Sequence, residues 1–223
     1  MAIGVAGVLL LSALEPAEPA IPDSEPKAVR AEPNDLAAPM QFSLDSAGTL
    51  HAEGSIEPGT AARLALELQA VGTKVKVISL NSPGGSLNEA IALGEQIRFA
   101  NLSAEVADGA VCASSCPLFF AGGTTRSAGS RAAIGVHQFY AAPVPGLRGA
   151  ENAMSDAQLT TARITRYLAE MGVDPAAWLH ALDTPPSSLY YYSSYELAEY
   201  GFVTSGKTAP LAQKVDKVAR LFE

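Results

Sequence analysis

The feature that most constrains the fold is an apolar run that passes through two glycines directly into an amphipathic helix. The run covers residues 75–80 and is followed by the turn Ser-Pro-Gly-Gly at residues 82–85. Beyond the turn, apolar residues from Leu87 to Ile97 recur at the spacing of one helix face. A buried strand that leads straight into a helix is typical of α/β proteins with a largely parallel sheet. The sequence therefore predicts an α/β fold.

The same alternation continues along much of the chain and predicts the order of the elements. Strands are expected at 49–54, 74–80, 104–111 and 132–137, with helices at 60–71, 86–100 and 115–121. The character then changes to longer helical segments. The sequence predicts helices from Ser155, capped through Gln158, to Met171, from Asp174-Pro175 onward, from a cap at Ser194 onward, and at 211–221.

Three segments carry residue types suited to serine nucleophile chemistry. The glycines at 84 and 85 allow backbone N–H groups to approach a bound carbonyl, as an oxyanion hole requires. Ser114 precedes the expected helix 115–121, where the Ser115 N–H is a candidate second donor. His137 ends the last expected strand and is a candidate base. The structural alternatives are an ordinary helix cap at Ser114 and a packed core histidine at 137.

The N-terminal 40 residues differ from the rest in composition. Residues 1–14 form a short uncharged apolar stretch, which predicts the hydrophobic part of a signal peptide or the remnant of an anchor. Residues 15–40 are rich in Pro, Glu and Ala and lack apolar periodicity, so we expect a disordered tether. The globular domain is then expected at 41–223. This arrangement predicts an exported protein, periplasmic or membrane-anchored and facing the periplasm.

Composition argues against several other function classes. The net charge of −8 comes without a basic stripe interleaved with aromatic residues, so we expect no nucleic-acid partner. The three histidines lie far apart in sequence, without partners at ligand spacing, so we expect no metal site. The chain also has no glycine-rich phosphate loop that ends in Gly-Lys-Ser or Gly-Lys-Thr. We therefore expect no cofactor.

The two cysteines, Cys112 and Cys116, flank Ser114 closely. If both stood on one helix, their Cα atoms would be about 6 Å apart, which is inside the range for a disulfide. An exported protein would gain a brace around the nucleophile from such a bridge, whereas cytosolic cysteines would remain two small buried residues. The sequence leaves both states open.

Taken together, these motifs resemble those of the proteolytic subunit of Clp protease. Residues 80–85, LNSPGG, are similar to its INSPGG turn, and residues 112–123, CASSCPLFFAGG, are similar to its nucleophile helix AASMGAFLLTAG. Residues 136–138, VHQ, resemble the IHQ segment that carries its histidine, and segments between 183 and 203 resemble its C-terminal motifs. The similarity spans Leu50 to Thr204. It also extends to exported bacterial relatives with a CASAC-type segment and, more distantly, to signal peptide peptidase A.

This resemblance implies a role for each matching residue. Ser114 would be the nucleophile, His137 the general base, and the N–H groups of Gly84 or Gly85 and of Ser115 the oxyanion hole. The third member of the triad does not carry over, because no acidic residue stands at the matching position. Asp183, a few residues away, is the candidate for orienting the imidazole, and Ser187 is the alternative.

The resemblance also implies a fold and a function. The fold would be a ClpP-like and crotonase-like spiral of ββα units, with a largely parallel sheet and protruding helices that mediate homo-oligomer contacts. The function would be serine-type hydrolysis of peptide or protein substrates, without a cofactor. The missing aspartate motivates a first alternative, a weak or inactive scaffold that binds peptides or a membrane-associated partner. A second alternative is a crotonase-like acyl-CoA enzyme, since that fold shares the oxyanion turn.

Overall fold

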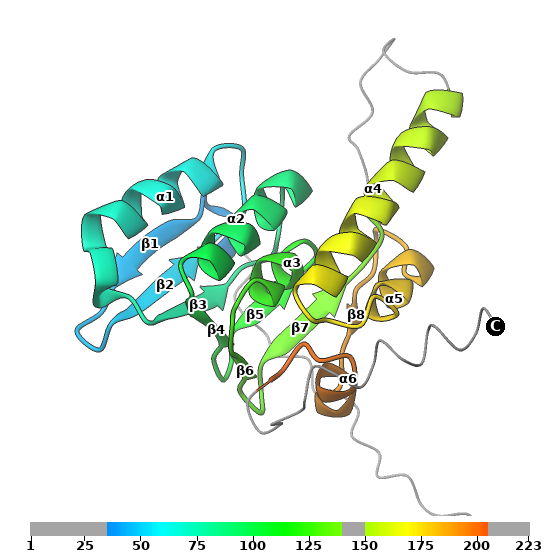
Figure 1. Ribbon diagram of the computed structural model, residues 1–223. Coiled ribbons are helices and arrows are strands. Elements are labelled where there is room, and N and C mark those ends of the chain that lie inside the picture. Colours follow the sequence, from blue (N-terminus) through cyan, green and yellow to red (C-terminus); the bar gives the residue numbers. More distant parts are fainter. Residues whose placement is uncertain (1–34, 140–149, 205–223) are drawn as a thin grey trace, which may run out of the picture.

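The computed structural model describes residues 35–139 and 150–204 (Figure 1). Its strands are β1 (Gln41–Leu44), β2 (Thr49–Glu53), β3 (Val77–Asn81), β4 (Ser103–Val106), β5 (Val111–Ala113), β6 (Arg126–Ala128), β7 (Ala133–Val136) and β8 (Tyr190–Tyr191). Its α-helices are α1 (Thr60–Val71), α2 (Leu87–Phe99), α3 (Cys116–Ala121), α4 (Ala150–Glu170), α5 (Ala177–Asp183) and α6 (Ser194–Glu199), and short 3-10 turns cover Asp35–Ala37 and Gly72–Lys74. The α/β class is confirmed.

The strands form two sheets, and one type of unit, a strand in each sheet followed by a helix, occurs twice. The five-stranded sheet has the order β1-β2-β3-β4-β6 and is parallel except for β1. The three-stranded sheet has the order β5-β7-β8, with β5 and β7 parallel and β8 antiparallel. Both β4-β5-α3 and β6-β7-α4 place their first strand in the larger sheet and their second strand in the smaller one. These are the ββα units that the sequence resemblance implied.

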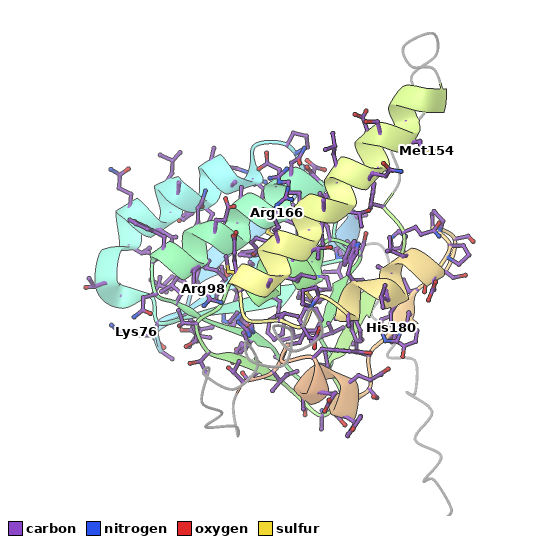
Figure 2. The ribbon with its side chains drawn as sticks, turned by 45° about the vertical axis from the view of Figure 1, so that its right-hand side comes forward. Lys76, Arg98, Met154, Arg166 and His180 are labelled. Carbon is purple, nitrogen blue, oxygen red and sulfur yellow. A yellow bond between two sulfur atoms is a disulfide. The ribbon has the colours of Figure 1, made fainter. Side chains whose placement is uncertain are left out.

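Helices α1, α2 and α3 stand beside one another on one side of the larger sheet (Figure 1). Their inward side chains, such as Leu64, Ile91 and Phe119, are fully buried in one hydrophobic core. In α4, the C-terminal half packs on this core through Ile164 and Leu168. The N-terminal half extends away from the body, and Figure 2 shows Met154 near its far end. The buried side chains that α4 contributes to the described core, Ile164, Tyr167 and Leu168, thus all lie in its C-terminal half.

Two arginines hold the C-terminal ends of α3 and α4 together. Backbone carbonyls in the last turn of a helix lack partners within the helix and carry the negative end of its dipole. Arg126 is 2% exposed, and its guanidinium donates to the carbonyls of Ala121, Gly123, Met171, Gly201 and Phe202. Arg98 donates to three of the same carbonyls. Burial lowers the pKa of Arg126 to about 10, so the side chain remains a cation at neutral pH.

The expected strand at 104–111 is wrong. The chain leaves the larger sheet at Val106 and joins the smaller sheet at Val111. A turn separates the two strands, and Gly109 adopts a φ of 85° within it. The dipeptide Asp108-Gly109 is an ordinary turn signal that the apolar residues around it obscured. The short strands β1, β6 and β8 were also not predicted, because none is long enough to show alternation.

Two helix starts also differ from the prediction. Helix α4 begins at Ala150, before Ser155 and Gln158, so this pair does not cap it. Helix α6 is capped by Ser193 rather than Ser194, because the Ser193 hydroxyl accepts from the backbone N–H of Glu196 in a complete capping box. The predicted helix end near Met171 is confirmed, and Gly172 follows with a φ of 73°.

The domain begins earlier than residue 41. Met40, the last residue of the predicted tether, is fully buried, and its carbonyl accepts a hydrogen bond from Arg63. The predicted signal or anchor segment at 1–14, most of the tether and the helix at 211–221 lie outside the described residues. Within the described ranges, no helix combines the length and the apolar character that crossing a bilayer requires.

Candidate active site

The turn at residues 82–85 joins β3 to α2 and lies directly against the nucleophile segment. Gly84 and Gly85 have φ angles of 92° and 143°, which L side chains rarely adopt. A Cβ on Gly84 would lie 2.7 Å from the Cβ of Ser114 and 2.8 Å from the N of Ser115. A Cβ on Gly85 would collide with the carbonyl of Ile56. The two glycines therefore allow the turn to lie directly against the backbones of residues 114–115 and of Ile56.

Ser114 occupies the tight turn between β5 and α3. Its φ is 60°, and Asn101 is the only other non-glycine with positive φ among the described residues. Holding a residue in the left-handed region costs about 1–3 kcal/mol. The cap of α3 is Ser115, so the interpretation of Ser114 as an ordinary helix cap is wrong. The Ser114 N–H donates to the carbonyl of Gly135 over 2.9 Å, which ties the turn to β7.

His137 follows β7 and meets the serine. Its Nε2 lies 2.8 Å from the Ser114 Oγ, although the two residues are 23 positions apart. The imidazole is half-buried, and this burial lowers its pKa below the ordinary histidine value, against an opposing effect of the Gln138 backbone. The ring is therefore neutral near pH 7. A neutral imidazole in contact with a hydroxyl can accept its proton.

Two backbone N–H groups near Ser114 are available as hydrogen-bond donors to a bound oxygen. The Gly84 N–H donates to the Ser82 Oγ over 3.1 Å. The hydrogen bonds within the described part of the chain leave the N–H groups of Gly85 and Ser115 unused. These two residues are also joined, because the Ser115 Oγ donates to the Gly85 carbonyl over 3.2 Å. Of the two glycines that the sequence left as alternatives, Gly85 is therefore the better oxyanion donor.

A disulfide encloses this turn. The Sγ atoms of Cys112 and Cys116 are 2.02 Å apart, and both residues are fully buried. Cys112 lies in β5 and Cys116 is the first residue of α3, so the bridge joins a strand to a helix rather than two positions of one helix. The three residues between them include the nucleophile candidate.

The two candidates for a third catalytic residue lie elsewhere. Asp183 is the last residue of α5, Ser187 follows in the next loop, and both side chains are exposed. No hydrogen bond joins His137 to either of them in residues 35–139 and 150–204. Instead, the backbone N–H of Gln138 donates to the Thr184 carbonyl over 2.9 Å. The end of α5 therefore supports the strand that carries His137 through backbone contacts.

An open cleft of about 1090 Å³ runs past these residues. Gly85, Ser114 and His137 line it, together with side chains that the sequence analysis did not single out. Phe139 follows His137 by two residues, Trp178 comes from α5, and residues of the N-terminal half of α4 form another wall. No short motif marks these positions in the sequence, because their meeting depends on how α4 and α5 pack.

The described residues contain no group of three His, Cys, Asp or Glu side chains placed to hold a metal ion.

In comparisons with known proteins, the model of one family, described as Clp protease, matches residues 50–205. No curated protein matches the chain. The matched region contains the turn at residues 82–85, the Ser114 turn and the strand β7 that precedes His137.

Proposed function

Because the chain belongs to the Clp protease family, we propose that it is a serine-type peptidase acting through a Ser114–His137 pair. The observation that carries the proposal is the 2.8 Å contact between the Ser114 Oγ and the His137 Nε2. It joins a serine in a strained strand-to-helix turn to a histidine whose burial keeps it neutral. Both residues open onto a cleft large enough for a peptide.

The proposed reaction proceeds through an acyl-enzyme. The Ser114 Oγ forms a bond with the scissile carbonyl carbon, and its proton passes to the His137 Nε2. The carbonyl π electrons move to the oxygen, which becomes an oxyanion. When the electrons return, the C–N bond breaks and the amine leaves with the proton from His137. Water then attacks the ester carbonyl carbon and gives a proton to His137. When this second tetrahedral intermediate collapses, the C–O bond to Ser114 breaks and the Ser114 Oγ takes the proton from His137, which releases the acid and restores the free enzyme.

The oxyanion hole in this proposal is formed by the N–H groups of Gly85 and Ser115. Both are backbone donors fixed by their turns, so they need little reorganisation when the charge develops. The hydrogen bond from the Ser115 Oγ to the Gly85 carbonyl supports this assignment, because it holds the two donor residues at one spacing.

We also propose that the protein works outside the cytosol as a homo-oligomer. The Cys112–Cys116 disulfide supports export, since disulfides persist in oxidising compartments and are rare in the cytosol. The similarity of the CASSC segment, residues 112–116, to the CASAC-type segment of exported relatives is a second support for export. The N-terminal half of α4, which extends from the body, is the surface that we assign to contacts between copies (Figure 1).

One observation favours a second candidate, a weak or inactive scaffold that binds peptides in the same cleft. Asp183 and Ser187 are both exposed, and neither makes a hydrogen bond to the imidazole among the described residues. Loss of the orienting carboxylate costs a serine protease about 10⁴ in kcat. If no carboxylate orients the imidazole during the reaction, the protein would still bind peptides in the cleft but would lose most of its turnover.

Labelling with a fluorophosphonate separates the two candidates. We expect the purified protein to be labelled at Ser114 and to hydrolyse casein, and Ser114→Ala to abolish both while leaving the folding transition intact. Ser43→Ala is the matched control, because it removes an exposed serine hydroxyl on β1 outside the cleft. A wild-type protein that stays unlabelled, or equal turnover by Ser114→Ala, would contradict the peptidase and leave the scaffold.

A further inference from the structure

Ser82 opens the oxyanion turn but has no place in the reaction described above. Its side chain is fully buried. All its polar groups are nevertheless paired. The backbone N–H donates to the Val111 carbonyl over 2.7 Å, and the backbone carbonyl accepts from the Ala113 N–H over 3.0 Å. The hydroxyl donates to the Gly54 carbonyl over 2.6 Å and accepts from the Gly84 N–H over 3.1 Å.

These four hydrogen bonds connect three segments that surround the candidate active site. Gly54 follows β2, Gly84 belongs to the oxyanion turn, and Val111 and Ala113 belong to β5, which leads into Ser114. A buried hydroxyl that bridges two backbone groups fixes their spacing. If either backbone group moved away, it would be left buried without a hydrogen bond, and its desolvation would be uncompensated. Ser82 therefore joins the oxyanion turn, residues 82–85, to the strand β5 that leads into Ser114.

The Ser82 hydroxyl also distinguishes the two glycines. By accepting the Gly84 N–H, it turns that donor away from the cleft and leaves the next N–H, that of Gly85, for a substrate oxygen. The backbone bonds to β5 fix the same turn relative to Ser115, which carries the other donor. A side chain behind the turn thus determines which backbone group faces the reacting carbonyl.

We propose that Ser82 is a positioning residue that sets the geometry of the oxyanion hole. The proposal rests on the peptidase function proposed above. Ser82 does not touch the substrate in this arrangement. Its hydroxyl holds the Gly85 N–H at the distance from the Ser115 N–H that a tetrahedral oxyanion requires. Misplacement of a catalytic group by about 1 Å costs on the order of a hundredfold in rate, so loss of the hydroxyl should affect chemistry more than binding.

The first test compares Ser82→Ala with Thr60→Ala. Thr60 is a matched control because it is also fully buried, and its hydroxyl also accepts from a backbone N–H and donates to a backbone carbonyl, both of Glu57. It does not line the cleft. With acetyl-Ala-Ala-Leu-aminomethylcoumarin, we expect Ser82→Ala to lower kcat about 10- to 100-fold with KM changed less than about threefold. Thr60→Ala should lower stability and leave kcat near the wild-type value.

Inhibitor binding separates positioning from a general loss of structure. A peptide boronic acid forms a tetrahedral anionic adduct with a serine, whereas the matching peptide amide binds without one. We expect Ser82→Ala to weaken the boronic acid in proportion to its loss of kcat and to leave the amide unchanged. Equal weakening of both ligands, or an unchanged kcat in a folded Ser82→Ala protein, would overturn the proposal.

Amide hydrogen exchange in the wild-type protein tests the same geometry without turnover and without a variant. The Gly84 N–H should exchange more slowly than those of Gly85 and Ser115, and the boronic acid should slow exchange at the latter two only. Fast exchange at Gly84 would overturn the role of Ser82 even in an active enzyme. If the Gly84 N–H is protected from exchange in a protein whose Ser114 is never labelled, the positioning role of Ser82 stands and the proposed peptidase function is wrong.

Discussion

Ser114 adopts a backbone conformation that a serine has no intrinsic reason to choose. The φ of 60° is maintained by contacts on both sides of the residue. The Ser114 N–H is bonded to Gly135, and the flanking Ala113 N–H is bonded to Ser82. These bonds offset a strain of about 1–3 kcal/mol, and the hydroxyl emerges between strand and helix, where it meets His137. The strain is thus the cost of holding the Ser114 hydroxyl toward His137 in a rigid turn.

The burial of His137 predicts the pH dependence of hydrolysis. Burial lowers the pKa of the imidazole below about 6.5, and only the neutral ring can accept the serine proton. As the pH falls through this lowered pKa, we expect kcat/KM to decline about tenfold per pH unit, and to be flat from the pKa up to pH 8. Initial rates from pH 4.5 to 8 check this. A midpoint above 7 would show that the ring is stabilised as a cation, which the structure contradicts.

A second prediction concerns the third member of the catalytic group. Asp183 is exposed and makes no hydrogen bond to His137 within the described ranges. We therefore expect Asp183→Asn and Ser187→Ala each to change kcat by less than about threefold, whereas an orienting carboxylate would cost about 10⁴. Steady-state kinetics of both variants measure this. A fall of several orders of magnitude in one of them would assign that residue to the imidazole and require a loop movement on substrate binding.

At the scale of elements, the parts of the site that adjoin long periodic segments were predictable. The turn at 82–85 follows a buried strand and precedes an amphipathic helix, and the helix 60–71 has the bounds observed for α1. The contact between Ser114 and His137 came from the family resemblance, since local pattern alone allowed an ordinary cap and a core histidine. The sequence could not predict that Trp178 and Phe139 line the cleft, because the packing of α5 against β7 brings them there.

The disulfide joins β5 to α3 across the serine turn and gives a prediction at this scale. The loop that it closes is short, so removing it should lower the free energy of unfolding by about 2 kcal/mol. We expect Cys112→Ala/Cys116→Ala to show this loss in urea titration, together with reduced kcat because the turn is less restrained. Reductant offers an independent control, since these are the chain's 2 cysteines. A fully active, equally stable double variant would show that the backbone bonds to Gly135 and Ser82 are sufficient to restrain the Ser114 turn without the disulfide.

At the scale of the whole molecule, α4 is the element least explained by the single chain. Its C-terminal half belongs to the core, and two arginines donate to the carbonyl of Met171, the residue that follows its end. Its N-terminal half extends from the body and leaves Met154 67% exposed near the far end (Figure 2). Part of this half also lines the cleft. Contacts between copies at α4 would therefore cover apolar surface and stabilise one wall of the substrate site at the same time.

This arrangement predicts that assembly and activity depend together on the end of α4. Met154→Glu places a charge on the extended half, and burying that charge between copies would be unfavourable. We expect it to shift the protein toward monomer in sedimentation velocity and to lower peptide hydrolysis in step. Leu66→Glu is the matched control, because Leu66 is 65% exposed on α1, in the body of the domain. If Leu66→Glu alone dissociates the assembly, the contact surface does not lie on α4. If the wild type is a monomer at micromolar concentration, α4 makes no contact between copies, and the wall of the cleft is stable without a second copy.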